Sequence, residues 1–121
     1  MFKNLFNKRA TTDSDIPRVN MTHENQIEEL LNLSNQKPIL LFKHSTRCGI
    51  SSMVLKRFEN KIKNEESDFG YYFLDLLQHR DLSNAIAQKL EVPHQSPQLI
   101  VVKDGKVSKH GSHYAIVDVD I

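Results

Sequence analysis

Two short apolar segments separated by a helical pattern constrain the fold of this chain most strongly. Residues 38–43 form a nearly continuous apolar run that is too short for a helix and that indicates a buried strand. A second run, Gly70–Leu76, is almost as apolar. Strands that are hydrophobic on both faces are typical of parallel neighbours covered by helices on both sides. The two segments therefore predict an α/β fold that contains parallel strands.

Three helical segments and a terminal hairpin complete the pattern. Asp104–Gly105 is a dipeptide typical of two-residue hairpin turns, and it joins the last two expected strands, 98–103 and 106 to about 110. Asp81 is expected to be the N-cap of the third helix. The helices themselves are expected at about 22–34, 49–64 and 82–90. This order predicts a four-stranded mixed sheet flanked by helices.

Length, charge and hydropathy limit the classes of function. A chain of 121 residues is expected to form one domain, here 21–121, after a partly flexible N-terminal extension at 1–20. Its 16 basic and 15 acidic residues give a net charge of +1, so no nucleic-acid partner is expected. No segment approaches the roughly 20 apolar residues of a membrane span, so no stable membrane insertion is expected. The N-terminus lacks a secretory signal, which favours a cytoplasmic location.

The only cysteine, Cys48, lies where the first strand gives way to a helix. Unpaired backbone N–H groups and the helix dipole favour negative charge at that position, and Arg47 adds a neighbouring cation. These environments favour a reactive thiolate. A single cysteine excludes an internal disulfide, and no paired-cysteine zinc pattern occurs, so no bound metal is expected. The alternative is a small buried hydrophobe, in which case the domain is a non-catalytic interaction module.

A redox cysteine at the end of the first strand fits a thioredoxin-like fold. The second anchor of that fold is a proline just before the third core strand, and Pro97 lies there. We therefore predict that the Ser96–Pro97 peptide bond is cis and that Pro97 faces Cys48. The alternative is an ordinary trans proline that starts an edge strand. The exposed backbone of Gln95 and Ser96 is expected to pair with a substrate backbone as an added strand.

With these two anchors placed, the chain resembles the monothiol bacilliredoxin family of bacteria that use bacillithiol. The resemblance lies in three segments, 41–51, 80–87 and 92–98. The family commonly has Cys-Pro-Ile-Ser, whereas this chain has Gly49, which is expected to loosen the first helical turn. Gly49 also makes the segment similar to the Cys-Gly-Phe-Ser monothiol glutaredoxins, although the Gly-Gly-x-Asp turn that grips glutathione there is missing. The chain also leaves little room for a final helix.

The resemblance implies a monothiol oxidoreductase that removes bacillithiol from S-bacillithiolated proteins. The Cys48 thiolate would attack the low-molecular-weight sulfur and form a Cys48–bacillithiol intermediate. Ser51 stands where a dithiol enzyme keeps its second cysteine, and it either donates a hydrogen bond to the Cys48 sulfur or caps backbone groups. Bacillithiol is then a co-substrate, and no resident cofactor is expected. The glutaredoxin likeness implies the alternative of an iron–sulfur cluster carrier, with Cys48 and an external thiol as ligands.

Further residues next to these segments are candidates for substrate binding. Lys43 and Arg47 are expected to attract the malate carboxylates of bacillithiol, although Lys43 is equally consistent with an ordinary strand-end charge. Gly49 is expected to line the same site. His44 and His94 adjoin the site segments and are expected to orient or pack. The alternative is that either one transfers a proton, since histidine titrates near neutrality. The protein is expected to be a monomer or a weak dimer.

Overall fold

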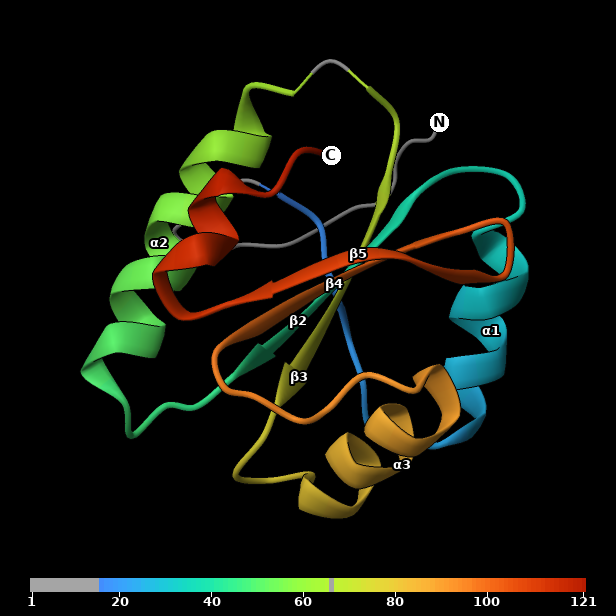
Figure 1. Ribbon diagram of the computed structural model, residues 1–121, viewed down its shortest axis with the longest axis horizontal. Helices are drawn as coiled ribbons and strands as arrows, with labels where there is room; N and C mark the ends of the chain where they lie inside the picture. The colour runs from blue at the N-terminus through green and yellow to red at the C-terminus, as the bar shows by residue number, and fades with distance from the viewer. Residues whose placement is uncertain (1–15, 66) are drawn as a thin grey trace.

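The computed structural model describes residues 16–65 and 67–121 and has a central sheet with helices on both faces (Figure 1). Within these residues the sheet contains five strands in the order β1-β3-β2-β4-β5. β1 and β2 each run parallel to β3, whereas β4 runs antiparallel to both β2 and β5. The strands are β1 (Val19–Asn20), β2 (Ile39–His44), β3 (Gly70–Asp75), β4 (Gln98–Lys103) and β5 (Lys106–Ser112). The helices are α1 (Asn25–Leu33), α2 (Gly49–Lys63), α3 (Arg80–Leu90) and the 3₁₀ helix η1 (His113–Asp118).

The α/β class and the mixed sheet are confirmed, but the prediction of four strands is wrong by one. The additional strand, β1, pairs Val19 with Tyr72 and Asn20 with Phe73. It has only two residues, both exposed, so it carries no alternation that a sequence pattern would reveal. Most of the extension expected at 1–20 lies outside the described residues. Its last part, however, belongs to the sheet.

A partly buried ion pair holds the segment before β1 against the domain. Arg18 lies 3.9 Å from the centroid of the Phe73 ring and donates to Glu59 on α2 over 2.8 Å. The hydroxyl of Tyr71 on β3 donates to the same carboxylate over 2.7 Å. Burial and then the neighbouring Glu59 raise the pKa of Tyr71 well above its usual value. Glu59 therefore joins three segments that are distant in sequence.

Each face of the sheet has its own apolar core because side chains alternate along a strand. On β2, Ile39 and Leu41 pack into a cluster with α1 and α3, whereas Leu40 and Phe42 pack into a second cluster with α2 and η1. All six residues of β2 are buried. This explains why the segment reads as a continuous apolar run rather than an alternating one. It is the central strand of the sheet.

The directions of the strands bring three connections to one edge of the sheet. The carboxyl ends of the parallel strands β2 and β3 lie at this edge, and the amino end of the antiparallel strand β4 lies there too. Lys43 pairs with Gln98, so Pro97 continues β4 beside the end of β2. Figure 1 shows the connection after β2 and the connection before β4 at the same end of the sheet. We refer to this edge as the thiol edge because Cys48 follows β2.

The predicted helices and the terminal hairpin form with small shifts. Asp81 is not the N-cap of α3: the helix begins two residues earlier than expected, at Arg80, with His79 as its N-cap. Asp81 lies in the first turn, where its negative charge interacts favourably with the helix dipole. In the hairpin turn, Asp104 and Gly105 have φ values of 52° and 79°, as a type I′ turn requires. The backbone of Asp104 donates to the Ser34 carbonyl over 2.8 Å, which ties the hairpin to the end of α1.

The segment after β5 forms the 3₁₀ helix η1 instead of a full final helix. Its Ile116 is completely buried in the cluster that contains α2. Lys61 on α2 donates to the carbonyls of Val117 and Val119 over 2.8 and 2.7 Å. A cation at the carboxyl end of a helical turn satisfies free carbonyl groups and favours the local dipole. The six residues of η1 therefore cover part of α2 near its C-terminal end without a long helix.

Lys43 is a charged side chain inside the core, on the α1 and α3 face of β2. It has 0% relative exposure, so it is neither a solvated strand-end charge nor accessible as a surface cation. Burial lowers its pKa from 10.5 to about 8. Its ammonium donates to the Ser83 carbonyl on α3 over 3.3 Å.

No helix in the described part of the chain is long and apolar enough to cross a bilayer.

Replacement of Gly49 by proline is expected to raise the free energy of unfolding by about 0.4–1 kcal/mol, because it restricts the unfolded chain. Gly49 is the first residue of α2, where proline is favoured, and Cys48 before it is already extended (φ −105°, ψ 118°). An added Cβ would meet no heavy atom within 4 Å. Urea denaturation checks the value, with Gly49→Ala as a control of smaller effect. A lower midpoint for both variants would contradict this account of the helix start.

The stability difference between the Lys43→Met variant and the wild-type protein is expected to depend on pH. Below pH 8 the lysine is charged in both states, and the buried ammonium destabilises the folded state, so the variant is more stable by up to about 3 kcal/mol. Between pH 8 and 10.5 the unfolded chain binds the extra proton, so wild-type stability rises and the difference shrinks. Denaturation of both proteins at pH 7, 8.5 and 9.5 tests this. A difference that stays constant would contradict it.

Candidate active site

Cys48 occupies the N-cap position of α2, as predicted, and it is partly exposed. Its backbone N–H donates to the Ser45 carbonyl over 3.2 Å, and its carbonyl accepts the Ser52 N–H over 3.2 Å. The first turn of α2 contains no acidic residue. The sulfur therefore lies at the positive end of a helix dipole, without a neighbouring carboxylate in that turn. Arg47 is exposed beside it.

Ser51 is fully buried, and its hydroxyl ties the first turn of α2 to the end of β2. The hydroxyl oxygen lies 2.8 Å from Nδ1 of His44, and it accepts the N–H of Ser45 over 3.1 Å. Within the described residues these are its two polar partners, and the sulfur of Cys48 is not one of them. Of the two roles considered for Ser51, the contacts match the one that caps backbone groups.

His44 lies between the sheet and this first turn. Its ring centroid is 5.6 Å from that of Phe73 and 6.4 Å from that of Phe42, so apolar rings surround it. Burial is the main cause that lowers its pKa, and the charge of Asp75 partly opposes this effect. The imidazole of His44 is therefore neutral at pH 7, and this side chain packs against the phenylalanine rings while it contacts the Ser51 hydroxyl.

The Ser96–Pro97 peptide bond is cis, as predicted. Pro97 is buried, Ser96 is half-buried and Gln95 is exposed. Among the described residues, the backbone groups of Gln95 and Ser96 make no backbone hydrogen bond. The hydroxyl of Ser96 is buried without a partner. This connection therefore leaves unpaired backbone groups at the thiol edge, as an added substrate strand would require.

A polar cluster under α3 was not foreseen from the sequence. Besides Ser83, the ammonium of Lys43 contacts Nδ1 of His94 over 3.4 Å, and Ser83 Oγ lies 3.2 Å from the same ring nitrogen. Gln98, opposite Lys43, donates to the Pro93 carbonyl over 3.0 Å. We call Lys43, Ser83 and His94 the Lys43 cluster. A signal for it was present, because a lysine interrupts an otherwise apolar central strand.

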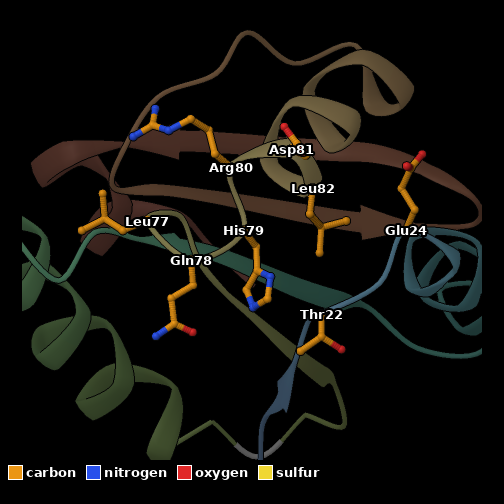
Figure 2. A pocket seen from close by; sticks show the side chains of 8 residues that line it. All are labelled: Thr22, Glu24, Leu77, Gln78, His79, Arg80, Asp81 and Leu82. Carbon is orange, nitrogen blue, oxygen red and sulfur yellow. The ribbon is translucent and has the colours of Figure 1, made fainter.

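A hollow of about 420 Å³ lies next to the thiol edge, between the start of α1 and the connection from β3 to α3. Figure 2 shows the side chains that line it, which include Thr22, Gln78 and His79. None of the predicted site residues lines this hollow. Across residues 16–65 and 67–121, no group of three or more histidine, cysteine, aspartate or glutamate side chains is placed to hold a metal ion.

The structure thus places the predicted site residues in two groups, one at the thiol edge and one buried beneath it. Arg47, Cys48 and Gly49 lie at the exposed start of α2, and Gln95, Ser96 and Pro97 lie in the connection before β4, at the same edge of the sheet. Ser51 and Lys43 lie beneath this edge and are fully buried.

Comparison with solved structures identifies the fold. One structure, described as having a thioredoxin fold and with an oxidoreductase activity proposed for it, matches with a TM-score of 0.73 and 29% identity, over 84% of this chain and 88% of the other. The thioredoxin of Malassezia sympodialis matches with a TM-score of 0.64 and 18% identity, over 88% of each chain. The thioredoxin of Trypanosoma brucei brucei matches with a TM-score of 0.64 and 19% identity, over 90% of this chain and 88% of that one.

These likenesses show a thioredoxin-like fold. The family model described as monothiol bacilliredoxin BrxC matches residues 19–121, which begins at β1 and includes every described strand and helix. The one cysteine at the start of α2 agrees with the word monothiol in that description. The chain belongs to the monothiol bacilliredoxin family.

Proposed function

We propose that this protein removes bacillithiol from protein mixed disulfides by thiol–disulfide exchange at Cys48. The observation that carries the proposal is a single, partly exposed cysteine at the N-cap of α2, beside a connection whose backbone groups have no backbone partner among residues 16–65 and 67–121. Helix N-termini stabilise the thiolate, which is the attacking form in disulfide exchange. Membership of the bacilliredoxin family supports bacillithiol as the small thiol.

The exchange needs only Cys48, the mixed disulfide and a second thiol from outside the chain. The Cys48 thiolate attacks the bacillithiol sulfur of the mixed disulfide, a new disulfide forms between these two sulfurs, and the bond to the target protein breaks. The target thiolate leaves and takes a proton from water. A second thiol then attacks the bacillithiol sulfur of the Cys48 adduct, a disulfide forms between that thiol and bacillithiol, and the Cys48 thiolate leaves. An external thiol must do this because the chain contains one cysteine.

The surroundings of the sulfur support recognition of a protein. Ile50 and Met53 on the first turns of α2 are 40% and 37% exposed, and Leu77 after β3 is 37% exposed. Exposed apolar side chains near a reactive group favour contact with another protein surface. The unpaired backbone of Gln95 and Ser96 supports the addition of an extended substrate segment. Arg47 supports attraction of an anionic small thiol.

We infer that Ser51 holds the first turn of α2 in place and does not act on the Cys48 sulfur, because its hydroxyl already contacts His44 and Ser45.

Replacement of Cys48 by serine is expected to abolish the reaction. A model protein capped with bacillithiol is mixed with the wild-type protein, and both proteins are analysed by intact mass spectrometry. The wild-type protein should gain one bacillithiol while the model protein loses it. The Cys48→Ser variant should show neither change. Release of bacillithiol by the variant would overturn the proposal, and equal transfer from a glutathione-capped protein would leave the exchange in place but remove the preference for bacillithiol.

Replacement of Ser51 by alanine is expected to lower the free energy of unfolding by about 1–3 kcal/mol, because the Ser45 N–H and the His44 ring nitrogen lose their buried partner. Urea denaturation measures the change. Ser52→Ala provides a matched control, because Ser52 is exposed in the next position of the same helix. Unchanged stability together with lost transfer to Cys48 would instead favour a direct role of the hydroxyl in the chemistry.

A further inference from the structure

The Lys43 cluster fixes the orientation of His94, which has no part in the exchange described above. Nδ1 of His94 lies 3.4 Å from the Lys43 ammonium and 3.2 Å from the Ser83 hydroxyl. A charged lysine has three donors and no acceptor. The nitrogen that faces it must therefore accept, so the proton of the neutral ring is on Nε2. His94 is exposed, so this tautomer presents an N–H donor to solvent.

The charges around His94 have one sign. Burial and the cations Lys43 and Arg80 lower its pKa, and no carboxylate of the described residues is among the groups that shift it. Figure 2 shows the Arg80 side chain extending away from Glu24 and Thr22, on the side of the connection between α3 and β4. His94 is thus a neutral donor in a positive surrounding. Such an arrangement favours an anion that accepts a hydrogen bond.

The position of His94 links this donor to the reaction. It lies three residues before Pro97, in the connection that reaches the thiol edge beside the end of β2. Two residues further along, the buried hydroxyl of Ser96 has no hydrogen-bond partner in the part of the chain that the structure describes. The same connection therefore combines an outward donor at His94, a free hydroxyl at Ser96 and unpaired backbone groups.

We propose that His94, backed by Lys43 and Arg80, binds a carboxylate of the small thiol while its sulfur reacts at Cys48. This inference rests on the proposed function, and it assigns the recognition of the small thiol to the α3 side of the thiol edge. Lys43 then acts through His94 and not as a surface ligand, in agreement with its complete burial. Arg80 is exposed and adds long-range attraction.

Single-turnover transfer to Cys48 tests the proposal. The same model protein is capped either with bacillithiol, which carries carboxylates, or with 2-mercaptoethanol, which carries none. His94→Leu should slow transfer of bacillithiol about tenfold at low substrate concentration, the effect of one lost hydrogen bond to a charged group. The loss should disappear at saturating substrate. The same variant should change the rate of 2-mercaptoethanol transfer by less than about twofold.

Two further variants separate binding from a merely structural role. Gln places a side-chain N–H near the position of Nε2, so His94→Gln should recover most of the lost rate. Arg80→Gln, on an exposed residue, should slow only the bacillithiol substrate. Equal slowing of both substrates by His94→Leu, or no rescue by His94→Gln, would overturn the proposal.

A direct measurement does not depend on the reaction. Long-range ¹H–¹⁵N spectra of the wild-type protein should show Nε2 of His94 protonated and Nδ1 unprotonated, and titration with malate should shift these signals. A protonated Nδ1, or no shift with malate, would overturn the inference. If the wild-type protein takes no bacillithiol from the capped protein, the proposed function fails. The malate titration then still decides whether the anion site exists.

Discussion

The burial of β2 on both faces and along both edges is the constraint on which the site depends. β3 and β4 pair with it on either side, and separate apolar clusters cover its two faces. The end of such a strand is fixed, because a shift in register by one residue would move the side chains of each cluster, and the buried Lys43, to the opposite face of the sheet. The position of Cys48 follows from it: four residues after β2, the chain turns into α2, and Ser51 fastens that turn to His44 at the strand end. The thiol is thereby placed by the core.

The elements that bury apolar surface could be predicted from the sequence. β2, β3 and the three longer helices follow from apolar runs and helical periodicity, and the hairpin follows from Asp104–Gly105. β1 could not be predicted, since two exposed residues carry no pattern and its anchor is an ion pair between Arg18 and Glu59. Local propensity placed the cap of α3 at Asp81, whereas the strand end and the turn at Asp75 determine where that helix begins.

The features of the candidate site also divide into those that could be predicted from the sequence and those that could not. Cys48 at the helix start and the cis bond at Ser96–Pro97 were predictable because each depends on its place in the order of elements. The partners of Lys43 and Ser51 were not, because they come from segments up to 51 residues away and depend on how side chains turn inside the core. A lysine in a central strand indicates a special environment, but only the fold identifies Ser83 and His94 as its neighbours.

The short β1 and the charged β5 have a consequence for how two such molecules meet. A sheet edge with unpaired backbone groups invites another strand, and proteins discourage this with short or lysine-bearing edge strands. Here one outer strand has two residues, and the other carries Lys106 and Lys109. Joining of sheets between neighbouring molecules is therefore disfavoured at either margin.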